Sequence, residues 1–305
     1  MSGGLHITGP KSFILIADQL IAMRKLLFVL ILLFSKQGYS QDTCQWTLPY
    51  GNNPKAGAYA TVNGIRMYYE VYGPATAQPL LLIHGNGGYI QAMRCQIEHF
   101  KKTYRVIVAD SRFHGKSENG NVPLTYELMA ADYAALLRHL RLDSVYTIGQ
   151  SDGAIITLLM AINHPGSISK GIAMAPNLRP DSTALYARFV RSGKRTIDSL
   201  ERLIKAGSRD PSLQREAVHY RLMDEHPNIP TKALSRIQIP ILLMSADGDA
   251  ITLEHILEMY RALPKANLLI MPAATHGMLR QEYQLFNHMC QRFLDSPFKR
   301  PETNF

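Results

Sequence analysis

Short apolar and β-branched runs alternate along the chain with stretches whose apolar residues recur at helical spacing. The runs at 79–83, 105–109 and 144–148 are almost continuously apolar, which is typical of strands covered on both faces. Strand–helix alternation of this kind predicts an α/β fold with a doubly covered, mostly parallel, eight-stranded sheet. The expected strands are 60–62, 66–72, 79–83, 105–109, 144–148, 172–174, 239–244 and 267–271, and the expected helices are 89–100, 124–140, 154–163, 253–263 and 278–294.

One segment, residues 177–236, interrupts this alternation. It contains no strand-like run, only polar helical patterns divided by prolines. Its 12 Lys/Arg and 7 Asp/Glu residues give it a net charge of +5. The pattern predicts a small helical cap inserted between two strands of the sheet. The alternative is a long surface excursion without a role, although insertions of this length are commonly functional.

The first 40 residues do not continue the strand–helix pattern. A basic start at Met23-Arg24-Lys25 precedes the apolar run 26–34 and a short end with small residues, which together are typical of a secretory signal peptide. We therefore expect translation to begin at Met23 and the mature chain at Gln41, so that 1–40 is an extension plus signal peptide and 41–305 is the folded domain. This predicts export to the periplasm or the medium; an uncleaved membrane anchor is the lesser alternative.

The composition of the 305 residues excludes several classes of function. Hydrophobic residues make up 46% and charged residues 19%, the balance of an ordinary globular protein. Lys and Arg exceed Asp and Glu by 33 to 24, but they form no clustered basic run, so we do not expect a nucleic-acid partner. Three cysteines without a C-x-x-C pair exclude a thiolate zinc site and a disulfide framework. Two unpaired buried thiols are expected for Cys95 and Cys290, with a bond between them as the alternative.

The sequence Gly149-Gln150-Ser151-Asp152-Gly153 follows an apolar strand and opens a helix. This is the context of a nucleophile elbow, in which the serine stands exposed at the end of the strand. The two glycines are needed because the turn is too tight for side chains two residues on either side of the serine. The motif predicts that Ser151 is a nucleophile.

A base and an orienting acid are expected later in the chain, in the order Ser, Asp, His. The run 239–244 leads to Asp247 and Asp249, and the run 267–271 leads to His276. These residues fall near the carboxyl ends of strands, where catalytic groups gather in open α/β sheets. Asp247 and Asp249 both remain candidates for the acid on spacing alone.

These motifs make the chain resemble the α/β-hydrolase fold family over residues 59–294, and most closely its biphenyl-hydrolase-like serine esterases. Residues 80–88 (LLLIHGNGG) resemble the oxyanion strand and loop, and 106–117 (VIVADSRFHGKS) resemble the family's D-x-R segment, with Phe113 in place of a glycine. The resemblance implies that Ser151 is the nucleophile and His276 the general base. It also implies that Asp249 is the orienting acid.

The resemblance further places the oxyanion hole at the backbone N–H groups of Asn86 and Asp152. Of the other histidines, His84 is expected to orient the oxyanion loop, and His114 to lie on the surface. The expected activity is that of an exported serine hydrolase that cleaves a small ester, amide or thioester without a metal or cofactor. The alternatives are a C–C bond hydrolase with the same triad and a non-catalytic small-molecule receptor; an epoxide hydrolase would carry Asp at position 151.

Substrate contacts are expected from the cap side chains Tyr186, Phe189 and Tyr220, and from Asp152. A cap with few long apolar runs predicts a preference for short acyl chains. Asp152 is either a carboxylate favoured by the first turn of a helix or a binding group for a substrate ammonium. The partner is expected to be a small molecule, with no stable membrane span after signal cleavage. Neither the substrate's identity nor the oligomeric state follows from the sequence.

Overall fold

The computed structural model describes residues 44–300. The predicted signal peptide, its start at Met23 and the cleavage before Gln41 lie outside the described residues. Among the residues that are described, no helix has both the length and the apolar character needed to cross a bilayer.

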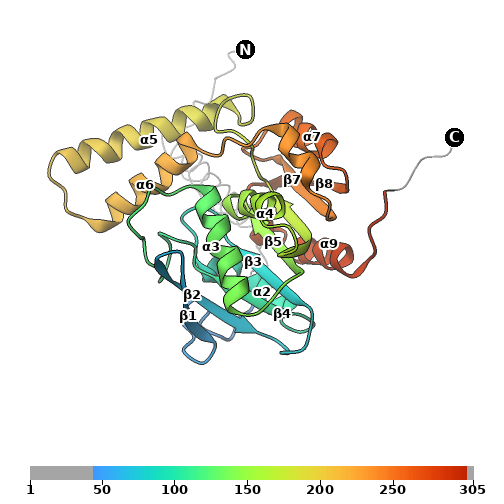
Figure 1. Ribbon diagram of the computed structural model, residues 1–305. Coiled ribbons are helices and arrows are strands. Elements are labelled where there is room, and N and C mark those ends of the chain that lie inside the picture. Colours follow the sequence, from blue (N-terminus) through green and yellow to red (C-terminus); the bar gives the residue numbers. More distant parts are fainter. Residues whose placement is uncertain (1–43, 301–305) are drawn as a thin grey trace, which may run out of the picture. The chain divides into compact units, whose positions relative to one another are not determined.

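Eight strands form a single sheet in the order β1-β2-β4-β3-β5-β6-β7-β8 (Figure 1). β1 pairs antiparallel with β2, and β2 antiparallel with β4; all the other pairs are parallel. The predicted mostly parallel sheet is therefore confirmed. The strands are β1 (Gly57–Val62), β2 (Ile65–Tyr72), β3 (Pro79–Ile83), β4 (Arg105–Ala109), β5 (Val145–Gln150), β6 (Ile168–Met174), β7 (Ile241–Gly248) and β8 (Ala266–Thr275).

Helices cover both faces of this sheet. α3 packs against α4, and α2 packs against α9 on the opposite face (Figure 1). The side chains of Leu80, Leu81 and Leu82 in β3 are fully buried as a result, which explains the continuous apolar run. The helices are η1 (Ile90–Met93), α2 (Arg94–Phe100), α3 (Tyr126–His139), α4 (Asp152–Asn163), α5 (Ala187–Lys205), α6 (Pro211–Glu225), η2 (Thr231–Arg236), α7 (Leu253–Ala262), α8 (Met278–Gln281) and α9 (Tyr283–Asp295).

The segment between β6 and β7 contains the helices α5 and α6, which pack side by side (Figure 1). We call α5, α6 and the residues that join them the cap. α6 begins with Pro211 in its first turn, and the Asp210 side chain accepts a hydrogen bond from the Ser212 N–H at that end. One isolated antiparallel bridge, between Leu185 and Ile251, ties the chain before the cap to the loop after β7.

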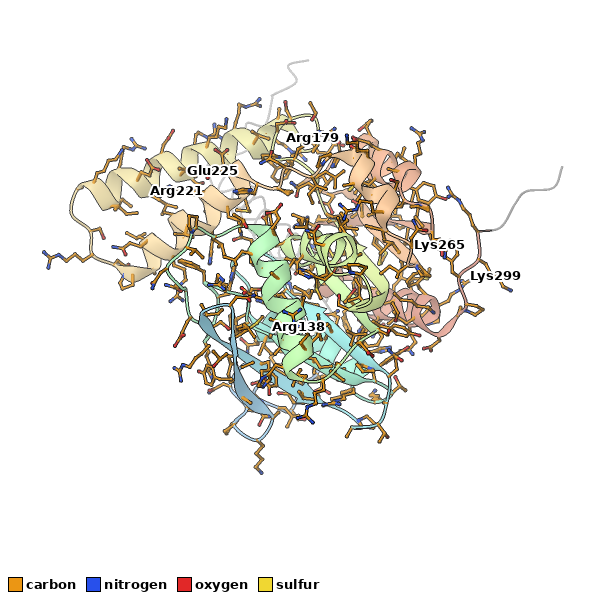
Figure 2. All side chains as sticks on the ribbon, viewed as in Figure 1. Arg138, Arg179, Arg221, Glu225, Lys265 and Lys299 are labelled. Atoms are coloured by element: carbon orange, nitrogen blue, oxygen red, sulfur yellow. A yellow bond between two sulfur atoms is a disulfide. The ribbon has the colours of Figure 1, made fainter. Side chains whose placement is uncertain are left out.

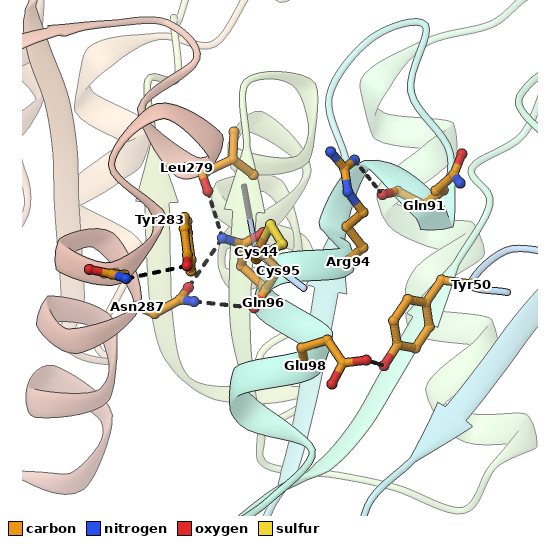
Figure 3. The surroundings of a disulfide bond; sticks show 11 residues. Cys44, Tyr50, Gln91, Arg94, Cys95, Gln96, Glu98, Leu279, Tyr283 and Asn287 are labelled. Atoms are coloured by element: carbon orange, nitrogen blue, oxygen red, sulfur yellow. Dashed lines mark hydrogen bonds between the residues drawn. A yellow bond between two sulfur atoms is a disulfide. The ribbon is translucent and has the colours of Figure 1, made fainter. Parts of the chain in front are cut away.

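The cysteine prediction was wrong for Cys95 and is confirmed for Cys290. A disulfide joins Cys44 to Cys95, with a Cα–Cα distance of 5.6 Å (Figure 3), while Cys290 is a free, buried thiol. The bond is possible because the chain after Cys44 runs over α2, where the Tyr50 hydroxyl donates to Glu98 at 2.5 Å. Cys290 instead faces the core, with its Sγ 3.9 Å from the sulfur of Met244.

Candidate active site

Three side chains that directly follow parallel strands meet at one edge of the sheet. Ser151 follows β5, Asp249 follows β7 and His276 follows β8. The Nε2 of His276 lies 3.0 Å from Ser151 Oγ, and its Nδ1 lies 2.8 Å from Asp249 Oδ1. Carboxyl ends of adjacent parallel strands share an edge, so residues far apart along the chain come within hydrogen-bond distance.

Ser151 occupies a strained turn between β5 and α4. Its φ is +53° and its ψ −115°, a conformation that is rare for residues with a side chain. A Cβ on Gly149 would lie 2.1 Å from the carbonyl oxygen of Gly153, and a Cβ on Gly153 would lie 2.2 Å from that of Ile83. The requirement for glycine on both sides of Ser151 is therefore confirmed. The Ser151 N–H donates to Met174 in β6 at 2.8 Å, which holds the turn in place.

The two candidate acids have different surroundings. Asp249 is 1% exposed, and its Oδ1 accepts hydrogen bonds from His276 and from the N–H groups of Ala250 and Ile251. The carboxylate of Asp247 instead accepts the backbone N–H groups in β8 at residues 273 and 274. The structure thus brings Asp249, and not Asp247, to the histidine.

Burial and neighbouring carboxylates act in opposite directions on His276. Burial lowers its pKa, but the hydrogen bond and charge of Asp249, together with the charge of Asp152, outweigh burial and raise the pKa above its usual value. Because Nδ1 faces a carboxylate, it carries the proton in the neutral ring. Nε2 is then the acceptor that faces the Ser151 hydroxyl, which is the arrangement a general base requires.

The loop after β3 lies against the nucleophile. A Cβ on Gly85 would lie 3.1 Å from the Cβ of Ser151, so only glycine allows the loop this close without a shift. In the described part of the chain, the N–H groups of Asn86 and Asp152 donate no hydrogen bond to another residue. Both groups are therefore available to an oxyanion beside Ser151.

A known protein family matches the part of the chain that carries Ser151. The sequence profile described as "alpha/beta hydrolase fold" matches residues 78–196, which span β3, β4, β5 and the nucleophile turn.

The chain has the α/β-hydrolase fold.

Distant relatives span most of the chain. The serine hydrolase BPHL of Homo sapiens is 25% identical and covers 78% of this chain and 86% of its own length. Epoxide hydrolase 2 of Caenorhabditis elegans is 24% identical and covers 80% of this chain and 81% of its own. The crystal structure of the enol-lactonase from Burkholderia xenovorans LB400 superposes with a TM-score of 0.65 at 21% identity, over 78% of this chain and all of that one.

Two histidines join the oxyanion loop of this fold to its neighbours. His114 was expected on the surface, but it is 2% exposed, and its Nε2 accepts a hydrogen bond from the N–H of Gly87 at 3.2 Å. It is covered because the ring of His219 in α6 stacks on it, with centroids 4.1 Å apart and an interplanar angle of 10°. The backbone oxygen of His219 also accepts a hydrogen bond from the Asn86 amide at 3.2 Å. Polar cap sequence alone contains no signal for this contact.

His84 and Phe113 hold the remainder of this region. His84 Nδ1 lies 2.8 Å from the Gly85 carbonyl oxygen, and its Nε2 accepts from the Ser111 N–H at 3.0 Å. Burial lowers the pKa of His84 to about 4, so the ring is neutral at pH 7. Phe113, which replaces a glycine in the D-x-R segment, adopts a left-handed φ of +66°, and its carbonyl oxygen lies 3.2 Å from Nε2 of His219.

A cavity of about 330 Å³ lies beside Ser151 and beneath the cap. Phe189 and Tyr220 line it, as the sequence led us to expect of cap side chains, whereas Tyr186 is not among its lining residues and is 40% exposed. No group of three or more His, Cys, Asp or Glu side chains within residues 44–300 is arranged to hold a metal ion. Most of the surface that lines the cavity beneath the cap is apolar.

Asp152 lines this cavity although it is 3% exposed. Its Oδ1 accepts a hydrogen bond from the Tyr126 hydroxyl at 2.9 Å, and its Oδ2 has no hydrogen-bond partner among the described residues. Burial raises its pKa to about 6, although Tyr126, the nearby Asn86 amide and the charge of His276 act in the opposite direction. The carboxyl is therefore a buried group of the site rather than a solvated helix-start residue.

Proposed function

We propose that this chain is a serine hydrolase that cleaves a small ester, amide or thioester through an acyl-enzyme. The observation that carries the proposal is the continuous hydrogen-bonded series from Ser151 through His276 to Asp249, with distances of 3.0 and 2.8 Å. A serine at the elbow favours acyl transfer over epoxide opening, for which an Asp would be expected at this position. The similarity to the human serine hydrolase BPHL supports the same reaction class.

Each step of this reaction has a group suited to it. His276 Nε2 accepts the Ser151 hydroxyl proton as Oγ attacks the substrate carbonyl, and Asp249 stabilises the resulting imidazolium. The N–H groups of Asn86 and Asp152 hold the oxyanion. His276 then returns the proton to the leaving group, and water releases the acyl group by the same path in reverse.

The size of the cavity beneath the cap supports a small acyl group. Its volume of about 330 Å³ is at the lower end of the range for ligand pockets, about 300–1,000 Å³. We expect kcat/KM on p-nitrophenyl esters to be highest for short acyl chains and to fall as the chain lengthens. Highest activity on long-chain esters would contradict this, and loss of all turnover in Ser151→Ala is the control.

Asp152 supports a preference for an acyl group that carries an ammonium. Asp152 lines the cavity with one carboxylate oxygen, Oδ2, that has no hydrogen-bond partner among the described residues, and a pKa of about 6 leaves the carboxyl ionised at pH 8. A charge-assisted hydrogen bond to an α-ammonium is worth roughly 1.5–3 kcal/mol, or about 10- to 10²-fold in kcat/KM.

The test of this preference compares an amino-acid ester with its N-acetyl derivative at pH 8. We expect the wild type to favour the free amine and Asp152→Asn to lose that preference. Asp247→Asn is the control, because Asp247 does not line this cavity and its carboxylate accepts backbone N–H groups of β8. A wild type that does not distinguish the two esters would make Asp152 a positioning group for the helix start only.

Export of the protein is also proposed, on the signal-like sequence before residue 41. The Cys44–Cys95 disulfide supports it, because such bonds persist mainly in oxidising compartments. Sequencing the N-terminus of the protein recovered outside the cytoplasm should give Gln41 as the first residue. A chain that begins at Met23 would instead support the membrane-anchored alternative.

A further inference from the structure

Two cavities meet at the nucleophile. The cavity beneath the cap has a volume of about 330 Å³, and a second one has a volume of about 610 Å³. Ser151 and His276 line both, together with Tyr220 and Met223 of α6. A carbonyl carbon bound to Ser151 Oγ would therefore have space for one substituent in each cavity.

The two cavities differ in their access to solvent. The first is lined near Ser151 by buried side chains such as Tyr126, Asp152 and Ile251, whereas exposed residues, among them Ser212, Arg215 and Arg280, form part of the wall of the second. During the reaction the acyl group stays on Ser151, while the leaving group departs and water enters. The wider cavity, whose wall includes the exposed arginines, is therefore suited to the leaving group, and the smaller cavity beneath the cap to the acyl group.

Two arginines from different elements line the second cavity. Arg215 comes from α6 in the cap, and Arg280 comes from α8, which begins two residues after His276. Within residues 44–300, neither guanidinium has a hydrogen-bond or ion-pair partner. By contrast, Arg221, which lies on the same helix as Arg215 and is labelled in Figure 2, pairs with Glu201 at 2.7 Å.

The other titratable groups in this cavity leave a net positive charge. Among the described residues that line it, Glu216 is the one carboxylate. His219 is held neutral at pH 7, because burial lowers its pKa. His276 must be neutral to act as the base. The charged groups that line the cavity when the reaction begins are therefore two guanidiniums and one carboxylate.

We propose that the second cavity is a binding site for a leaving group that carries a carboxylate, with Arg215 and Arg280 as its specificity-determining residues. Guanidinium groups pair with carboxylates through directional, charge-assisted hydrogen bonds. The first cavity has the opposite character, since Asp152 and Asp224 line it and would repel an anionic acyl group. The substrate is thus an ester whose anionic group lies on the alcohol side of the bond. This inference rests on the proposed function, in which Ser151 is the nucleophile.

The kinetic test compares 4-carboxyphenyl acetate with its neutral analogue 4-carbamoylphenyl acetate. The readout is the ratio of their kcat/KM values, and intrinsic reactivity cancels because the same two esters are used with every variant. We expect Arg280→Gln and Arg215→Gln each to lower the ratio by about 5- to 10-fold at low salt. Glu216→Gln should raise it, an effect that misfolding cannot imitate.

Arg221→Gln is the matched control, because it removes an arginine from α6 that lies outside both cavities; the ratio should not change. Equal ratios in wild type and in both cavity variants would overturn the proposal. A preference for an anion in the acyl group instead, measured with phenyl hemisuccinate, would overturn the assignment of the two cavities.

A binding measurement separates this inference from the proposed reaction. Ser151→Ala is titrated calorimetrically with 4-hydroxybenzoate and with 4-hydroxybenzamide, the alcohols that the two esters would release. We expect the carboxylate to bind at least about 5-fold more tightly, and Arg280→Gln in the same background to abolish the difference. Selective binding without ester hydrolysis by the wild type would refute the serine hydrolase and leave the anion site standing; equal binding of both alcohols would refute the anion site.

Discussion

Buried carboxylates occur in two regions of this molecule, and the two regions treat them differently. In the first half of the sheet, Glu70 is fully buried and accepts four hydrogen bonds. They come from the hydroxyls of Tyr68 and Tyr72 and from the N–H groups of residues 51 and 53, at 2.7–2.9 Å. Asp132 is equally buried, and both of its oxygens accept hydrogen bonds from Arg112. These carboxylates are fully satisfied.

At the catalytic edge, Asp152 and Asp249 are just as inaccessible, yet each has an oxygen without a hydrogen-bond partner in the described chain. Leaving a buried polar group unsatisfied costs roughly 1–3 kcal/mol. Such groups are typical of functional sites, where a carboxylate orients a histidine or keeps an oxygen available to accept a hydrogen bond from a ligand. The difference separates carboxylates that hold the scaffold from carboxylates that serve the reaction.

Neutralising the acid of the site should have the largest effect. Asp249→Asn should lower kcat by about 10²-fold or more, because the histidine loses its orienting charge. Asp247→Asn is the matched control two residues away; it should change kcat little, since Asp247 contacts backbone N–H groups and not the histidine. Steady-state kinetics on a short-chain ester measures both, and a larger loss in Asp247→Asn would reverse the assignment.

Replacing a carboxylate that holds the scaffold should instead lower the stability of the fold. Asp132→Asn leaves the buried Arg112 guanidinium without its counter-charge, so the free energy of unfolding should fall by about 3–5 kcal/mol. Urea denaturation measures it. Glu118→Gln, which removes an exposed partner of Arg66, is the control and should leave the urea midpoint nearly unchanged. An Asp132→Asn variant as stable as the wild type would show that this pair does not hold the fold.

Asp152 should be a carboxylate that destabilises the fold. Its pKa in the folded chain is about 6, above the ordinary 3.8. The folded chain therefore favours the protonated carboxyl, and the fold loses stability as this group ionises while the pH rises through 6. Asp152→Asn should therefore raise the free energy of unfolding by up to about 3 kcal/mol at pH 8 and by under about 1 kcal/mol at pH 4. Denaturation at the two pH values checks this; a destabilised variant at pH 8 would count against it.

The smallest expected effect is a shift in the pH profile. Because carboxylates raise the pKa of His276, kcat/KM on a neutral ester should fall on the acid side with a midpoint above 6.5. Part of that rise comes from the charge of Asp152, so Asp152→Asn should move the midpoint to lower pH. An unchanged midpoint in the variant would mean that the Asp152 carboxyl does not act on the histidine.

The sequence predicted the parts of the fold that depend on local pattern. Continuous apolar runs identified the buried strands, and the residues that follow them identified Ser151 and His276. Spacing alone left both Asp247 and Asp249 as candidates, because both lie at the carboxyl end of β7 and side-chain direction separates them. The family resemblance implied Asp249.

Contacts between distant segments escaped prediction for the same reason. The chain after Cys44 contains no periodic pattern to show that it runs over α2, so Cys95 was expected to be a free thiol and its bond to Cys44 was missed. His114 lies in a polar loop, and nothing local indicates that His219 of the cap covers it. The raised pKa of Asp152 likewise depends on burial by its surroundings, including Tyr126 of α3, rather than on its place in α4.

Labelling with a fluorophosphonate, followed by peptide mass spectrometry, measures whether Ser151 is an activated nucleophile. We expect one label per folded chain, on the peptide that contains Ser151, with no label in Ser151→Ala or in heat-denatured protein. Labelling should be slower in Asp249→Asn and unchanged in rate in Asp247→Asn. A folded wild type that takes no label, or that is labelled only at another residue, would contradict a serine hydrolase and favour a non-catalytic receptor on this fold.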